Sequence, residues 1–198
     1  MKKTPSEHYS RRAFLKGSSA AAATSLATNA ADSVAQQSAT DRVIRGETAI
    51  KLDVNGSLRE VKVEPRTTLL DVLRYQLDLT GAKPVSLDGS SGASTVLIDG
   101  KPIMASTTLA LSARGKKIET VESLVGDEVP RAFVEQDAEQ CGFCTPGFVV
   151  AVRAFLNQNP NATEQQIRLG LNGNICRCGT YANVIQAAVS IAKGGGNG

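Results

Sequence analysis

Residues 140–147 read QCGFCTPG, and residues 173–181 read GNICRCGTY. These two segments hold all four cysteines of the 198-residue chain, as one C-x-x-C pair and one C-x-C pair: Cys141, Cys144, Cys176 and Cys178. A helix-sized stretch separates the pairs, so a helical fold can bring the two short loops together. Four soft sulfur ligands from two loops suit an iron–sulfur cluster or zinc. The spacing therefore predicts a closed four-thiolate metal site.

Two other uses of these cysteines compete with an iron–sulfur cluster. The C-x-C spacing is unusual for zinc, whose paired cysteines are generally two to four residues apart. A disulfide between Cys176 and Cys178 would close a strained, very small ring, whereas disulfides between the two loops remain possible. Zinc and disulfides therefore stay as alternatives, and both would leave the protein colourless.

The second half of the chain predicts four helices around the cysteines. Thr145 and Thr180 are expected to cap two of them, Pro146 fits the first turn of a helix, and Thr163 opens a capping-box pattern. The expected helices cover residues 129–138, 145–157, 163–171 and 180–192. Each cysteine pair then lies just before a helix, where backbone N–H groups can stabilise an anionic cluster.

The first half of the chain alternates between apolar and polar residues in short runs. Asn55-Gly56 and Asp99-Gly100 separate such runs and predict two β-hairpins. A helix capped by Thr67 or Thr68 is expected between the hairpins, over residues 69–77. The expected strands form a first hairpin over residues 48–63 and also cover residues 95–98, 102–104 and 118–121. This order resembles the β-grasp fold of plant-type ferredoxins.

The strings QCGFCTPG and GNICRCGTY closely resemble the small iron–sulfur subunit of the xanthine oxidase family of molybdenum hydroxylases, in particular the periplasmic aldehyde oxidoreductase type. The resemblance implies an α+β fold, with a β-grasp domain over residues 46–124 and a four-helix domain over residues 125–193. It implies one 2Fe–2S cluster, with these ligands: Cys141, Cys144, Cys176 and Cys178. It also places Gln140 and Cys178 near a molybdopterin cofactor, which is carried by a separate large subunit. An FAD-binding subunit or a cytochrome would accept the electrons.

Members of this family usually carry a second, plant-type cluster in the first domain, bound by a C-x4-C-x2-C-x11-C pattern. At that spacing this chain has four serines: Ser86, Ser91, Ser94 and Ser106. A serine hydroxyl is a much weaker acid and a harder donor than a thiol, so four serines cannot replace four cysteines as iron ligands. We expect a one-cluster subunit, in which hydrogen bonds close this loop and the first domain serves as a scaffold and docking surface.

The amino terminus predicts an export signal. Residues 10–16 read SRRAFLK, which matches the twin-arginine motif, and an alanine-rich stretch follows to about residue 31. This stretch is too short and too polar to span a bilayer, so stable membrane insertion is not expected. We expect residues 1–40 to be a signal peptide and linker, the protein to be periplasmic and exported already folded, and residues 194–198 to be a flexible tail.

Charge and composition exclude several function classes. Residues 1–30 carry five of the 22 basic residues and one of the 19 acidic ones, so the remaining chain has 17 basic and 18 acidic residues. There is no basic surface for nucleic acid. The single histidine, His8, lies in the predicted signal, and no phosphate-binding glycine loop is present. We expect no catalytic residue here and an electron-transfer role within an oxidoreductase complex. The alternative is a non-redox structural or assembly subunit, stapled by zinc or disulfides.

Overall fold

The computed structural model describes residues 43–194. The predicted export signal and linker, and all but the first residue of the predicted tail, lie outside the described residues. Residues 45–194 belong to one compact unit. Within it, two hydrophobic cores divide the described residues into a part that contains a sheet and a part built from helices.

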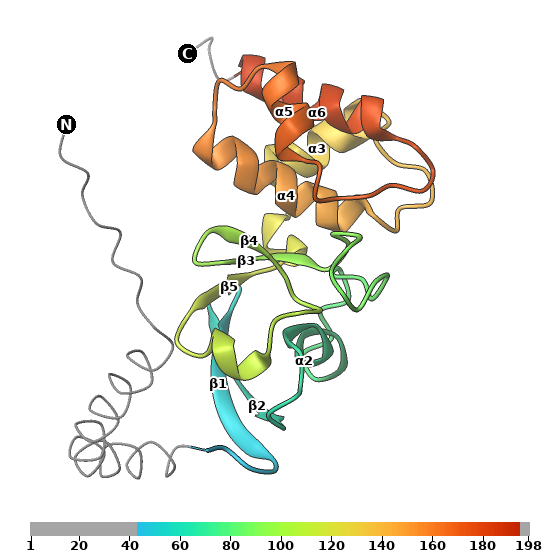
Figure 1. Cartoon of the computed structure of the whole chain (residues 1–198). Coiled ribbons are helices and arrows are strands. Elements are labelled where there is room, and N and C mark those ends of the chain that lie inside the picture. Colours follow the sequence, from blue (N-terminus) through green and yellow to red (C-terminus); the bar gives the residue numbers. More distant parts are fainter. Residues whose placement is uncertain (1–42, 195–198) are drawn as a thin grey trace, which may run out of the picture. The chain divides into compact units, whose positions relative to one another are not determined.

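The first part is built on a five-stranded mixed sheet with the order β2-β1-β5-β3-β4 (Figure 1). Its strands are β1 (Thr48–Val54), β2 (Ser57–Val63), β3 (Thr95–Ile98), β4 (Lys101–Met104) and β5 (Lys117–Glu119). β1 and β5 are parallel, and the other neighbouring pairs are antiparallel. Both hairpins turn where the sequence predicts, with positive φ angles of 52° and 75° at Asn55-Gly56 and of 50° and 74° at Asp99-Gly100. These backbone angles suit type I′ turns, which match the twist of the strands.

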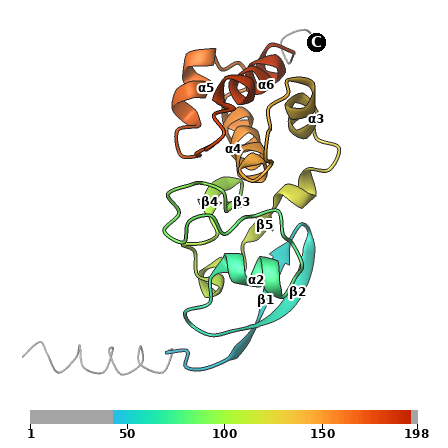
Figure 2. The same cartoon turned by 90° about the vertical axis from the view of Figure 1, so that its right-hand side faces the viewer.

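Helix α2 (Leu69–Tyr75) lies against this sheet and completes the β-grasp arrangement (Figure 2). Thr68 caps it by accepting the N–H of Asp71, as predicted. Its buried side chains join apolar residues of the strands in the first core, which includes Ile50, Leu52, Val63, Leu69, Leu73 and Ile118. Two 3-10 turns follow, η1 (Ala110–Ala113) and η2 (Val121–Leu124). The last strand was predicted to reach residue 121 but ends at Glu119, because the next N–H, of Thr120, donates to the Asn55 side chain.

Four helices form the second part, as predicted: α3 (Glu128–Glu135), α4 (Thr145–Gln158), α5 (Glu164–Gly170) and α6 (Tyr181–Gly194). Their core includes Val129, Phe133, Phe148, Val152, Ile167 and Val184. The capping box of Thr163 and Gln166 is confirmed. Helix α3 begins one residue earlier than predicted, because Asp127 caps it, and it ends three residues earlier, because Asp137, with a φ of 50°, turns the chain away.

The start of α4 differs from the sequence expectation. Cys144, and not Thr145, occupies the N-cap position, although Pro146 lies in the first turn as predicted. The hydroxyl of Thr145 is buried and has no hydrogen-bond partner among the described residues. A buried hydroxyl without a partner is costly, and this one lies directly beside a cysteine.

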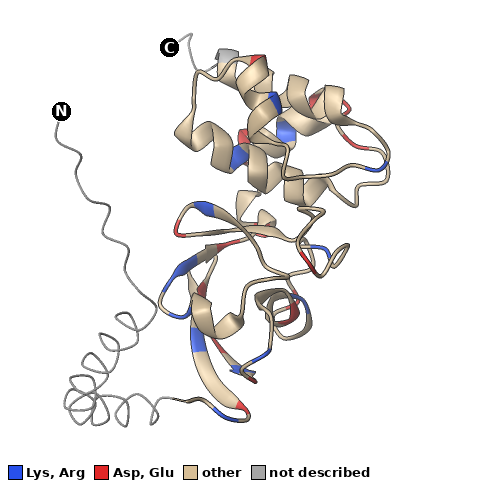
Figure 3. Cartoon of the chain, in the orientation of Figure 1, with Lys and Arg blue, Asp and Glu red and all other residues tan. Residues whose placement is uncertain are grey.

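The two parts meet where β3 faces α4. Leu97 packs against Val150 and Ala154 there, in a small third cluster of buried residues. Basic and acidic positions are interspersed along the ribbon of both parts (Figure 3). Among the described helices, none has the length and apolar character needed to cross a membrane.

Candidate metal centre

The two cysteine segments occupy the loops that lead into α4 and α6. Cys141 and Cys144 precede α4, and Cys176 and Cys178 lie between α5 and α6. Each segment contains a glycine in the left-handed region, with φ angles of 76° at Gly142 and 84° at Gly179. Glycine adopts this conformation without steric cost, which lets both loops turn tightly beside the cysteines.

All four cysteines are free, and the fold arranges them in two pairs across the loops. Cys144 interacts with Cys176, and Cys141 interacts with Cys178. The first pair is the more enclosed, since Cys176 is only 5% exposed, whereas Cys141 and Cys178 are both exposed. Each pair therefore joins one cysteine of the C-x-x-C segment to one cysteine of the C-x-C segment.

This pairing fits a centre with two metal ions. Within residues 43–194, no group of three or more Cys, His, Asp or Glu side chains is gathered as the ligands of one ion. Each iron of a 2Fe–2S cluster takes two thiolates, so two pairs of cysteines would supply its four protein ligands. The buried, unpartnered hydroxyl of Thr145 beside Cys144 is a further donor without an acceptor, as expected near an anionic group.

The surroundings shift the pKa values of Cys144 and Cys176 in opposite directions. Burial, followed by the interaction with Cys176, raises the pKa of Cys144 to about 12. Burial also opposes ionisation of Cys176, but hydrogen bonds from Thr180, Cys144 and the Gly179 backbone outweigh it and lower its pKa to about 7. The interaction with Cys141 raises the pKa of Cys178. Of the three cysteines whose pKa is shifted, Cys176 is the one that converts most easily to the thiolate, which is the form that binds metal.

Thr180 and Tyr181 hold Cys176 from two directions. The hydroxyl of Thr180 lies 3.2 Å from the sulfur of Cys176, and the backbone N–H of Cys176 donates to the hydroxyl of Tyr181 at 2.8 Å. The Tyr181 ring packs edge-on against Phe148, with the ring centres 6.1 Å apart. From the sequence, Thr180 was expected only to cap the last helix. The spacing of Thr180 and Tyr181, four and five residues from Cys176, was the available signal for a contact with this loop.

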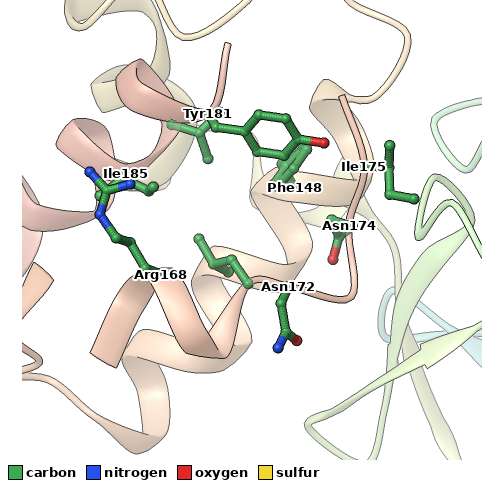
Figure 4. Close-up of a pocket in the computed structure, with 9 residues that line it drawn as sticks. Phe148, Arg168, Asn172, Asn174, Ile175, Tyr181 and Ile185 are labelled. Atoms are coloured by element: carbon green, nitrogen blue, oxygen red, sulfur yellow. The ribbon is translucent and has the colours of Figure 1, made fainter. Parts of the chain in front are cut away.

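A cavity of about 320 Å³ adjoins this segment on the side of α5 and α6. Its lining includes Phe148, Arg168, Asn174, Ile175 and Tyr181 (Figure 4). The close-up shows the rings of Tyr181 and Phe148 next to each other, with the Tyr181 hydroxyl directed toward the segment that carries Asn174 and Ile175. The aromatic pair thus forms a wall of the cavity as well as a support for Cys176.

Gln140 lies at the exposed side of the centre. Its side chain is exposed and comes directly before Cys141, which is also exposed. Two large apolar side chains nearby in the sequence are half-exposed, Phe143 at 51% and Ile175 at 52%. The outer pair of cysteines therefore lies on a surface with both polar and apolar groups.

The four serines are brought together, but as two closed hydrogen-bonded pairs. The hydroxyls of Ser86 and Ser91 lie 2.7 Å apart, and the hydroxyl of Ser94 donates to that of Ser106 at 2.9 Å. Ser94 and Ser106 are buried, with 2% and 5% exposure. Hydrogen bonds close this loop, as predicted from the sequence.

Comparisons with known proteins match this architecture. The family model described as the 2Fe–2S binding domain covers residues 118–189. A probable xanthine dehydrogenase component of Bacillus subtilis is 39% identical over 146 residues, which are 72% of this chain and 84% of that protein. The aldehyde oxidoreductase iron-sulfur-binding subunit of Escherichia coli K12 is 38% identical over 164 residues, which are 73% of this chain and 71% of that protein.

A solved structure shares the fold as well. The crystal structure of quinoline 2-oxidoreductase from Pseudomonas putida 86 contains a chain that is 38% identical to this one, with a TM-score of 0.72. The similarity covers 77% of this chain and 98% of the matched chain. A β-grasp part followed by a helical part is therefore the arrangement of this chain and of its structural relative.

Proposed function

This chain belongs to the family of small iron–sulfur subunits of xanthine dehydrogenases and aldehyde oxidoreductases, and we propose that it carries electrons away from the molybdenum cofactor of a separate large subunit through one 2Fe–2S cluster. The observation that carries this proposal is the arrangement of the four free cysteines as two pairs across two loops. Cys141, Cys144, Cys176 and Cys178 would hold the cluster, which supplies one-electron redox chemistry when it is bound.

The chain's own residues have three tasks at this centre. The cysteines bind as thiolates, and the lowered pKa of Cys176 favours its ionisation near neutral pH. When Cys176 is a thiolate, the hydroxyl of Thr180 would donate to its sulfur, and such hydrogen bonds tune the potential of iron–sulfur centres. Tyr181 fixes the backbone of the same residue.

We place the partner's molybdopterin cofactor at the exposed side, next to Gln140 and Cys178. Both residues are exposed and are therefore accessible to another subunit. The half-exposed side chains of Phe143 and Ile175 would supply apolar contact area at the same surface. The substrate would be an aldehyde or an N-heterocycle, in line with the names of the relatives, and its oxidation would take place on the large subunit.

The export motif at residues 10–16 supports a periplasmic location, reached by the twin-arginine route after the cofactor has been inserted. With serines at the second cluster position, electrons would leave directly from the single cluster. An FAD-binding subunit or a cytochrome would then have to approach that cluster.

Iron analysis of the complex, purified anaerobically with its large subunit, tests the proposal. We expect about two iron atoms per small subunit and the paramagnetic signal of a reduced 2Fe–2S cluster when substrate is added. Cys144→Ala should abolish this signal, whereas Ser86→Ala should retain it. Zinc in place of iron would overturn the cluster, and a cluster that substrate never reduces would favour the assembly-subunit alternative. About four iron atoms per chain would contradict the presence of a single cluster.

The proposed role of Gln140 has its own test. Gln140→Ala should slow the reduction of the cluster by substrate while the iron content stays unchanged. Gln136→Ala is the matched control, because it removes another exposed glutamine just after α3. Equal reduction rates in the two variants would remove Gln140 from the contact with the cofactor.

A further inference from the structure

The serine loop, which we define as residues 86–94, lies directly against the segment that carries Cys176. The backbone N–H of Ile175 donates to the carbonyl of Ser91 at 3.0 Å. The side-chain amide of Asn174 donates to the carbonyl of Gly92 at 2.9 Å, across 82 residues of sequence. Two hydrogen bonds thus join the sheet-containing part of the molecule to the two residues that precede Cys176.

The contact at Gly92 is too close for any side chain. A Cβ atom at Gly92 would lie 2.5 Å from the carbonyl oxygen of Gly173 and 2.6 Å from the amide nitrogen of Asn174. Gly147 shows the same crowding from the other side, since a Cβ atom there would lie 2.5 Å from the carbonyl oxygen of Gly92. Three backbone segments therefore meet at the carbonyl of Gly92.

Each of these segments is connected to the metal centre by a short stretch of chain. Gly147 lies in the first turn of α4, three residues after Cys144, and Asn174 lies two residues before Cys176. The segment of Cys176 is thus hydrogen-bonded to the carbonyl of Gly92, and the segment of Cys144 packs against the same carbonyl. Asn174 is itself only 7% exposed, so its amide cannot exchange this partner for water without opening the contact.

The serine pairs keep the loop in the conformation that this contact needs. Ser86 accepts the N–H of Ser91 at 3.0 Å, and the two hydroxyls bind each other. Ser94 is tied to Ser106 after β4 by two hydrogen bonds. The loop is therefore held on both sides of Gly92 without any metal.

We propose that Asn174 is a positioning residue. By donating to the carbonyl of Gly92, it holds the Cys176 segment at the point of the serine loop against which the Cys144 segment packs, and it thereby fixes Cys176 relative to Cys144. The first part of the chain, which has no cysteines, thereby sets the geometry of the cluster in the second part. This inference rests on the proposed function for the identity of the cluster. The anchoring itself positions the thiols of Cys144 and Cys176 whether or not a cluster is bound.

The first test uses the holoprotein in its complex. In Asn174→Ala and in the nearly isosteric Asn174→Asp, we expect iron loss to a chelator to be accelerated by roughly tenfold or more, because a buried acceptor loses its donor. We also expect a broadened paramagnetic spectrum of the reduced cluster, since the ligand geometry is no longer uniform. The spectrum reports the geometry of the centre, which a general loss of stability would leave unchanged.

Asn172→Ala is the matched control, because Asn172 is an exposed asparagine in the same segment. It should retain both the wild-type rate of iron loss and the wild-type spectrum. If Asn174→Ala and Asn174→Asp match this control in both measurements, the positioning role is refuted. Should Asn174→Ala fail to fold, Asn174→Asp alone decides, because it preserves the side-chain volume.

A second test separates failure of this inference from failure of the proposed function. In metal-free protein with Cys141 and Cys178 replaced by serine, mild oxidation with diamide should join Cys144 and Cys176 in a disulfide. Asn174→Asp should slow this reaction at least severalfold, because the two thiols are then less well held together. A slower reaction supports the anchoring even if the wild type carries no iron, and an unchanged rate refutes it.

Discussion

Replacing Gly92 with alanine should destabilise the holoprotein through two separate effects. The residue has a φ of 68°, and an L-residue in the left-handed region costs roughly 1–2 kcal/mol. The new methyl group would also overlap the carbonyl oxygen of Gly173 at 2.5 Å and the Asn174 amide at 2.6 Å. Overpacking of this kind costs about 1–3 kcal/mol. The neighbouring atoms belong to the backbone and to a buried side chain, so they cannot move away freely.

Gly100→Ala separates the two effects. Gly100 has a similar φ of 74°, but a Cβ atom there would meet nothing within 4 Å. The difference between the two variants therefore isolates the crowding, which should amount to about 1–3 kcal/mol. In thermal unfolding of the holoprotein, this corresponds to a Tm that is lower by about 2–12 °C in Gly92→Ala than in Gly100→Ala.

Iron release at a fixed temperature below both transitions completes the assay. Gly92→Ala should lose iron faster than Gly100→Ala, because the methyl group pushes apart the segments that lead to Cys144 and Cys176. Equal Tm values for the two variants would show that the close approach at Gly92 is relaxed in solution. A lower Tm with an unchanged rate of iron release would separate this contact from the metal centre.

Three further predictions concern the centre and the serine loop. Thr180→Val should lower the cluster potential in a redox titration by about 20–60 mV, the equivalent of one lost hydrogen bond to the sulfur of Cys176, whereas Thr180→Ser should retain it and an unchanged potential in the valine variant would contradict the role. Ser94→Ala should cost about 1–3 kcal/mol by leaving Ser106 without its partner, and the double variant Ser94→Ala/Ser106→Ala should cost less than the sum of the single variants in a thermal double-mutant cycle; strict additivity would contradict the pairing. In the metal-free, reduced protein, the pKa of about 7 for Cys176 lies below its ordinary value of 9.0, so the folded state binds fewer protons than the unfolded state between these pH values. The free energy of unfolding in urea should therefore rise from pH 7 toward pH 9 and lose this contribution as the pH falls through 7. Cys176→Ser should remove this rise, whereas the raised pKa values of Cys144 and Cys178 act in the opposite sense near pH 9. An equally steep rise in that variant would assign it to another group.

The elements with local signals could be predicted well from the sequence. Asn55-Gly56 and Asp99-Gly100 were enough to predict both hairpins. Two adjacent residues with positive φ suit the tight turn that joins antiparallel strands. Thr68 and Thr163 fixed the starts of α2 and α5 through side-chain caps. At α4 the same signal was misleading, because Thr145 follows a cysteine that takes the capping position itself.

The candidate site could be predicted only in part. Spacing identified the four cysteines, but it could not tell which cysteine of one loop faces which cysteine of the other. That pairing depends on how α4 and α6 pack around Phe148 and Tyr181. The hydrogen bond from Asn174 to Gly92 joins residues 82 positions apart, and no periodicity or motif in the sequence encodes such a contact.

The three-residue strand β5 has a consequence for how the molecule is synthesised. It lies between β1 and β3, and it is the last strand of the sheet to be made. Until Lys117–Glu119 have left the ribosome, the backbone edges of β1 and β3 that β5 will cover have no partner strand. An isolated hairpin is also only marginally stable in water. A nascent chain that stops before this strand therefore has two separate hairpins, whose unpaired edges can bond to other chains. The two hairpins become one sheet only when β5 pairs with both of them and buries Ile118 completely.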